Sequence, residues 1–169
     1  LNKLREIDFS TSENLKDVSV LADLPALTRV DFDGCTNLED ISSIYSLAPQ
    51  LTKIDFFGTK VPIEQQVQFL QEKLQNAVVL GESIDLYGYK FPTIFMRGTS
   101  DYMTLNTEGY HKELIAQKVG TDFVMLTIDG KDYNFVVNIK GASEEDLQLG
   151  EKVDYTVKAV LDDTQDDKT

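Results

Sequence analysis

Apolar and polar residues alternate in the same short phrase three times within the first third of the chain. The phrase reads Leu-x-x-(Ile/Val)-Asp-Phe and begins at Leu4, Leu27 and Leu51, so successive copies are 23 and 24 residues apart. A fixed period of this size is typical of repeat proteins, in which one unit cannot bury its apolar face alone and neighbouring units stack. Because the alternation has period two, each copy predicts a short strand.

The alternation also assigns each residue of these strands to a face. The polar positions point outward, and the equivalent residues Asp8, Asp31 and Asp55 would lie about 4.8 Å apart on adjacent strands. Like charges at that spacing cost stability unless they are offset, and Arg29 and Lys53 are the nearest residues that could offset them. The candidate partner-binding residues are the outward residues of the three strands: Glu6, Asp8, Arg29, Asp31, Asp33, Lys53, Asp55 and Phe57.

Three interpretations of this outward face stay open. It is a solvated face on which Arg29 and Lys53 balance the aspartates, since exposed ion pairs are common and weak. Alternatively it binds a partner, with Phe57 as an aromatic anchor of the kind enriched in interfaces. A calcium site on the aspartates is a third interpretation, although calcium usually takes carboxylates on loops together with carbonyl ligands. We expect no bound metal and no cofactor.

The pattern changes after Thr59 to a polar, glutamine-rich segment opened by Pro62. Its apolar residues recur at helical spacings and form one stripe: Ile63, Val67, Leu70 and Leu74. The stripe predicts a helix that ends near Asn76. We expect this helix to cover the open end of the stacked repeats.

From residue 77 onward, short runs rich in β-branched and aromatic residues alternate with Gly and Asp, which predicts an all-β region. Asp129-Gly130 between two apolar runs predicts a hairpin. The expected strands cover residues 77–80, 83–87, 93–97, 101–106, 112–117, 122–128, 132–139 and 153–160.

Charge and composition exclude several classes of partner and activity. The net charge of −13 over 169 residues argues against nucleic acid or an anionic membrane as a partner. The single cysteine, Cys35, lies far in the sequence from the single histidine, His111, so a nucleophile–base pair is not expected and we predict no enzymatic activity. No apolar run approaches the ~20 residues needed to cross a bilayer.

The repeated unit resembles the leucine-rich repeat, Leu-x-x-Leu-x-Leu-x-x-(Asn/Cys)-x-Leu, with Cys35 at the Asn/Cys position. Residues 80–86 (Leu-Gly-Glu-Ser-Ile-Asp-Leu) and 115–121 (Ile-Ala-Gln-Lys-Val-Gly-Thr) resemble bacterial immunoglobulin-like domains, although the tryptophan usual there is missing. Together these features resemble the internalin-like surface proteins of Gram-positive bacteria. The resemblance implies a multidomain α+β fold: a leucine-rich repeat solenoid with a capping helix, followed by an all-β immunoglobulin-like sandwich.

The resemblance also implies an organisation and a role. We expect repeats and capping helix in residues 1–76, the sandwich in 77–162 and an acidic tail in 163–169. The expected function is a secreted or cell-wall-attached adhesion module, which binds a protein or glycan through the concave face of the repeats and uses the sandwich as a spacer. We expect a monomer that is not inserted in a membrane, and, because the chain begins inside a repeat, a processed form or a fragment. The alternative is a purely structural stalk within a larger surface protein.

Overall fold

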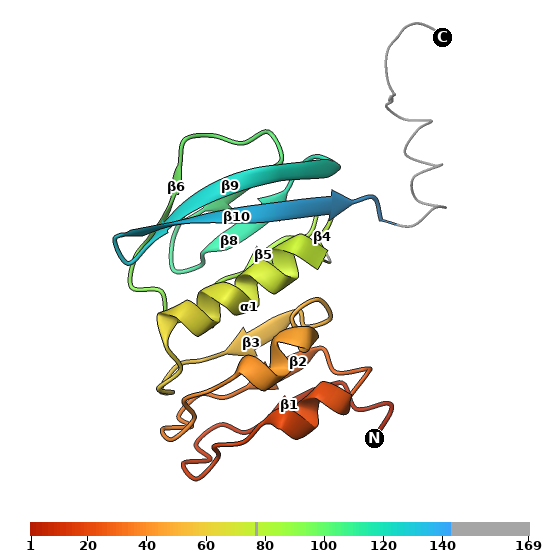
Figure 1. Ribbon diagram of the computed structural model, residues 1–169, viewed down its shortest axis with the longest axis vertical. Coiled ribbons are helices and arrows are strands. Elements are labelled where there is room, and N and C mark those ends of the chain that lie inside the picture. Colours follow the sequence, from red (N-terminus) through yellow and green to blue (C-terminus); the bar gives the residue numbers. More distant parts are fainter. Residues whose placement is uncertain (77, 143–169) are drawn as a thin grey trace, which may run out of the picture. The chain divides into compact units, whose positions relative to one another are not determined.

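The computed structural model describes residues 1–76 and 78–142, and Leu1–Ile139 form one compact unit (Figure 1). Three short sheets and one α-helix make up most of the regular structure of this part. The elements follow the chain in this order: β1 (Glu6–Asp8), η1 (Ser19–Asp23), β2 (Arg29–Asp31), η2 (Ser42–Leu47), β3 (Lys53–Asp55), α1 (Ile63–Asn76), β4 (Val78–Val79), β5 (Ser83–Asp85), β6 (Ile94–Arg97), β7 (Met103–Asn106), β8 (Glu113–Ala116), β9 (Gly120–Ile128) and β10 (Lys131–Lys140).

The three repeated phrases form the first sheet. Strands β1, β2 and β3 pair in parallel, with Ile7, Val30 and Ile54 in register across the sheet. The inward side chains of β2 and β3 are buried, as the alternation predicts, and the 3₁₀ turns η1 and η2 add Leu21 and Ile44 to the same core.

The phenylalanine that closes each phrase continues the core from one unit to the next. The Phe9 and Phe32 rings stack with centroids 5.9 Å apart, and the Phe32 and Phe56 rings with centroids 6.4 Å apart. Phe56 then meets Phe69 of α1 and Tyr89 edge-on, at 6.0 and 5.5 Å. The apolar core therefore runs without a break from the first sheet into the rest of the compact unit.

The turn after β5 packs directly onto β3. The backbone N–H of Phe56 donates to the Gly88 carbonyl at 2.7 Å. A Cβ at Gly88 would overlap the Ile54 carbonyl oxygen and would lie 2.9 Å from the Asp55 Cα. Only glycine therefore allows this close approach of the two backbones.

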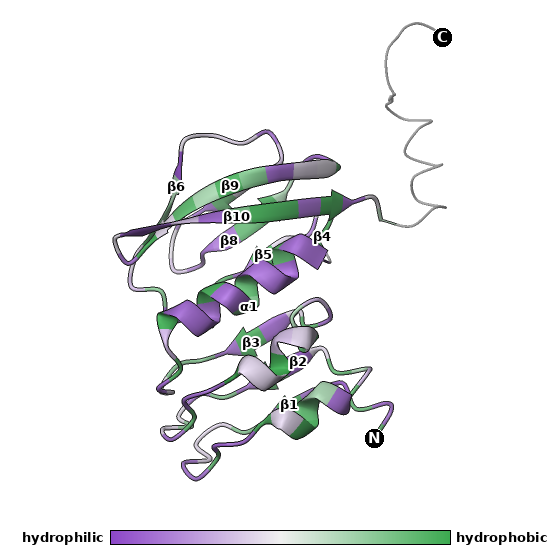
Figure 2. Ribbon diagram, viewed as in Figure 1, coloured by the Kyte–Doolittle hydropathy of each residue, from purple (hydrophilic) through white to green (hydrophobic). Residues whose placement is uncertain are grey.

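Helix α1 forms where the apolar stripe predicts it. Figure 2 shows hydrophobic and hydrophilic residues interleaved along the helix. Its buried apolar residues include Val67, Phe69, Leu70 and Leu74, and its Lys73 is buried too, where it pairs with Glu82 at 3.0 Å.

The glutamines of α1 connect it to both of its neighbours. Gln65 accepts a hydrogen bond from the N–H of Ile41 at 2.8 Å, just before η2. Gln71 bonds the backbone of Val136 in β10 twice, by donating to its carbonyl at 3.0 Å and accepting from its N–H at 3.1 Å. The helix lies between the first sheet and β10, as Figure 1 shows.

The remaining strands form two further sheets, in the orders β4-β10-β9-β6 and β5-β8-β7. The strand ranges predicted between residues 77 and 139 are confirmed to within two residues at each end. The hairpin prediction is also confirmed, because β9 and β10 pair antiparallel around Asp129 and Gly130, both of which have positive φ. The predicted strand at 153–160 and the acidic tail at 163–169 lie outside the described residues.

The predicted fold class is wrong. We expected a leucine-rich repeat solenoid closed by a capping helix and followed by an all-β immunoglobulin-like sandwich; the structure is a sheet-rich unit with one α-helix in its described part. The repeats contribute only three strands of three residues each, too few for a solenoid. Helix α1 does not cap an end. Its side chains form hydrogen bonds to the repeats on one side and to β10 on the other, and its buried apolar residues belong to the same core as those of its neighbours.

Candidate partner-binding face

The outward face of the first sheet gathers most of the predicted site residues. The pairing places Asp8 beside Asp31, and Asp31 beside Asp55, so the three aspartates form a column across the strands. A depression of about 300 Å³ lies over this face. Its lining residues are Glu6, Ile7, Asp8, Arg29, Val30, Asp31, Lys53 and Asp55.

Local backbone geometry explains why aspartate recurs at this position. One carboxylate oxygen of Asp8 accepts a hydrogen bond from the Ser10 N–H, and that of Asp31 does the same from Asp33, both at 2.8 Å. Asp55 repeats the bond with the Phe57 N–H at 2.8 Å. These turns end each strand in the same way. Each aspartate thus uses one oxygen for its own turn, which leaves the other for further contacts.

The two cations of the face pair with other acids. Arg29 lies 3.8 Å from Glu6, and Lys53 lies 3.4 Å from Asp85. Within residues 1–76 and 78–142, no cationic group lies within 4.0 Å of the column carboxylates. Arg29 and Lys53 therefore do not form the expected ion pairs with the aspartates of the column.

Asp55 and Asp8 differ in titration. Partial burial raises the pKa of Asp55 above its usual range and the negative charges of Asp31 and Asp33 add to the rise, while the Phe57 hydrogen bond and the Lys53 charge oppose it. Hydrogen bonds from Ser10 lower the pKa of the exposed Asp8. Burial and the neighbouring carboxylates together therefore disfavour the negative charge of Asp55.

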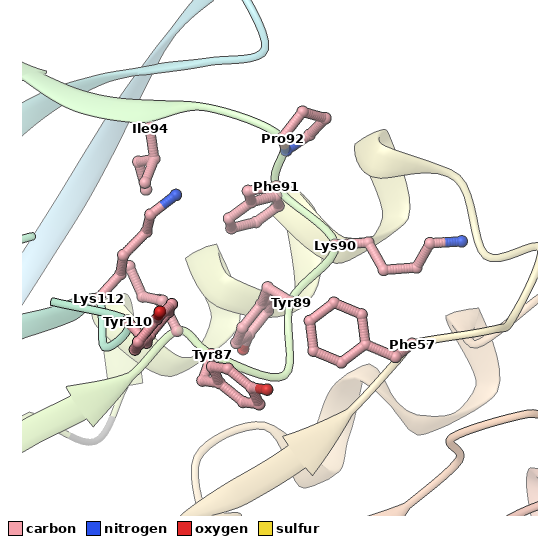
Figure 3. A pocket seen from close by; sticks show the side chains of 10 residues that line it. Phe57, Tyr87, Tyr89, Lys90, Phe91, Pro92, Ile94, Tyr110 and Lys112 are labelled. Carbon is pink, nitrogen blue, oxygen red and sulfur yellow. The ribbon is translucent and has the colours of Figure 1, made fainter.

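An aromatic cluster adjoins the column where β3 ends. Phe57, two residues after Asp55, meets Tyr87 edge-on with centroids 5.4 Å apart. Tyr87 lies 6.1 Å from the His111 ring and 6.0 Å from the Lys53 ammonium. Phe57 and Tyr87 come from segments far apart in the sequence, and both line a second cavity, shown in Figure 3.

Six of the eight predicted site residues line the depression, and the other two lie beyond it. Asp33 and Phe57 follow the ends of their strands, where Phe57 borders the aromatic cavity instead. Whether these residues bind a partner stays a prediction.

Sequence reasoning missed Asp85 and Tyr87. The available signal was residues 83–88, Ser-Ile-Asp-Leu-Tyr-Gly, which repeat the Ile-Asp-x-x-Gly pattern of residues 54–58. Asp85 forms the same turn, because it accepts the Tyr87 N–H at 2.8 Å.

The described residues offer little other chemistry. Cys35 is fully buried, its Sγ donates to the Phe9 carbonyl, and burial raises the pKa of its thiol. In the part of the chain that the structure describes, no three His, Cys, Asp or Glu side chains are placed to hold a metal ion. None of the helices described has the length and apolar character needed to cross a bilayer.

Comparisons of the chain with known protein families, with curated proteins and with solved structures found no significant match.

Proposed function

We propose that this protein is a non-enzymatic interaction module that binds a cationic partner through the outward face of strands β1–β3. The observation that carries the proposal is the aspartate column, whose three carboxylates lie side by side without a directly paired cation among the described residues. Such a column costs stability in the free protein, and a partner that brings positive charge offsets this cost.

The charge of the whole chain supports the same class of partner. A net charge of −13 attracts basic surfaces and steers them toward an acidic depression. Lysine or arginine side chains of a protein suit this face better than a neutral glycan, because they supply the charge that the carboxylates lack. The resemblance of the sequence to bacterial surface proteins extends the proposal to a secreted or cell-wall-attached adhesion module.

A structural stalk is the second candidate, and it also has a specific observation in its favour. Each aspartate of the column accepts the backbone N–H two residues ahead and so has a role in the turn itself. If this role alone explains the repeated aspartate, the face needs no partner.

A pair of charge-matched variants separates the two candidates. Asp31→Asn/Asp55→Asn removes two charges from the column, while the amide oxygen can still accept the turn hydrogen bond. Asp17→Asn/Asp40→Asn is the control, because these exposed aspartates accept the N–H groups of Ser19 and Ser42 in the same geometry away from the depression. Both variants and the parent are tested on an array of short basic, neutral and acidic peptides at low and physiological salt.

An interaction module predicts salt-sensitive binding of basic peptides by the parent and the control, and loss of that binding in Asp31→Asn/Asp55→Asn. Equal loss in both variants would show that only net charge matters. If none of the three proteins prefers basic peptides, the stalk is the better account.

A further inference from the structure

An aromatic cavity adjoins the aspartate column where β3 ends. It measures about 380 Å³, and five of its ten lining residues are aromatic. The lining residues are Phe57, Leu86, Tyr87, Tyr89, Lys90, Phe91, Pro92, Ile94, Tyr110 and Lys112. A cavity of this size and apolar lining suits one bulky side chain.

Several of these rings are exposed to an unusual degree. Phe57 is 37% exposed, Tyr87 47% and Tyr110 91%, whereas Tyr89 and Phe91 are buried at the base. Tyr89 and Phe91 stack at 5.1 Å, and Phe57 holds Tyr87 edge-on. Exposed rings on a packed aromatic base provide contact area for a partner with little loss of side-chain freedom on binding.

Lys112 makes the cavity a poor site for a cation. The other lysine, Lys90, points away from the remaining lining side chains, as Figure 3 shows, and donates to the Thr59 carbonyl at 2.5 Å. Lys112 stays on the cavity wall beside Tyr110. A positively charged side chain would be repelled here, while an aromatic ring would contact the cavity rings edge-on and the Lys112 ammonium face-on.

The cavity and the column adjoin where β3 ends. Asp55, the last residue of β3, lines the depression, and Phe57, in the turn directly after it, lines the cavity and donates its N–H to the Asp55 carboxylate at 2.8 Å. Lys53 links the two features, because it pairs with Asp85 at 3.4 Å and lies over the Tyr87 ring. A single extended segment can therefore reach both features.

We infer that the partner segment carries basic side chains for the aspartate column and an aromatic side chain that fills the cavity lined by Phe57, Tyr87 and Tyr110. This inference rests on the proposed function, because the same partner occupies both features.

Two synthetic peptides test it by calorimetric titration at low salt. The first is acetyl-Arg-Gly-Arg-Gly-Gly-amide, and the second has the same sequence with one Phe added before the amide. The parent should bind the Phe-containing peptide about tenfold more tightly, as expected for one well-packed ring. Tyr87→Ala and Tyr110→Ala should abolish this difference. Phe123→Ala is the control, since its ring is 63% exposed and lies outside the cavity.

Each outcome has a separate meaning. Equal affinity of the parent for both peptides overturns the inference but leaves the column as a binding face, provided that Asp31→Asn/Asp55→Asn weakens both. A tenfold preference that survives in both tyrosine variants also overturns it. Failure of both peptides to bind the parent overturns the inference and the proposed function together.

Discussion

The repeated aspartate serves two roles that oppose each other at the level of single residues. Its carboxylate ends the strand by accepting the N–H two residues ahead, which favours aspartate at each position. Its charge then lies beside the equivalent charge on the next strand, which disfavours the same residue. At Asp55 the negative charge is disfavoured overall, because partial burial of the carboxyl, together with the repulsion, outweighs the turn hydrogen bond.

Asp55→Asn should therefore stabilise the protein at neutral pH. The folded-state pKa of Asp55 is raised above its ordinary value of 3.8, so its destabilising charge appears as pH rises through the folded pKa and is absent below about pH 3.8. Solvent screens the effect, so we expect a rise in Tm of about 1–3 °C near pH 7 that disappears near pH 3. Thermal unfolding followed by circular dichroism across this range measures it.

Asp40→Asn is the matched control and should have the opposite sign. Hydrogen bonds from Ser42 lower the pKa of Asp40, so its charge stabilises the protein above the unfolded pKa and loses this effect as pH falls. A gain in Tm for Asp55→Asn that persists at pH 3 would show that packing, not charge, is its cause.

At the level of elements, a side chain of helix α1 forms backbone hydrogen bonds with β10 of the kind that a neighbouring strand would form. Strand β4 has only two residues, so it pairs with a small part of the long β10 edge. Gln71 supplies one donor and one acceptor to Val136, which is what a neighbouring strand would supply at that position. An amide side chain suits this role because it carries both groups without charge.

Gln71→Ala should destabilise the protein by about 1–3 kcal/mol, because it leaves the partly buried N–H and carbonyl of Val136 without this partner. Urea unfolding should show a lower midpoint with an unchanged m-value. Gln68→Ala is the control on the same helix, since Gln68 bonds Glu72 on the exposed side, and it should change stability by less than about 0.5 kcal/mol. Because alanine has a higher helix propensity than glutamine, propensity cannot lower the stability of either variant, and equal losses in the two would contradict this role of Gln71.

At the scale of the whole molecule, the continuous core joins the repeated region to the rest of the compact unit. Phe56 contacts Phe32 within the first sheet, Phe69 on α1 and Tyr89 after β5. A division of the chain after residue 76 would separate Phe56 from Tyr89 and the Phe56 N–H from the Gly88 carbonyl. These contacts predict that the unit unfolds cooperatively.

Hydrogen exchange followed by mass spectrometry at rising urea concentrations tests this cooperativity. We expect amides of β3 and β9 to reach the same free energy of opening, while amides of β1 at the sheet edge open earlier. Exchange of β3 well before β9 would instead support the domain boundary predicted at residue 76.

The sequence alone determined the local features of this protein. Alternation of period two assigned the inward and outward residues of the first three strands, and the spacing of Ile63, Val67, Leu70 and Leu74 identified α1. Asp129-Gly130 located the hairpin between β9 and β10. These predictions succeeded because periodicity and turn chemistry depend on the backbone within a few residues.

Only the tertiary structure decided what each buried face packs against. The same apolar stripe suits a helix that covers an end and a helix that lies between two sheets, so the stripe could not exclude the capping role that proved wrong. The acid paired with Lys53 comes from residue 85, and the aromatic cavity combines residue 57 with segments 86–94 and 110–112. Periodicity predicts that a face is buried, but it does not predict which element covers that face. The covering element depends on contacts between residues distant in the sequence.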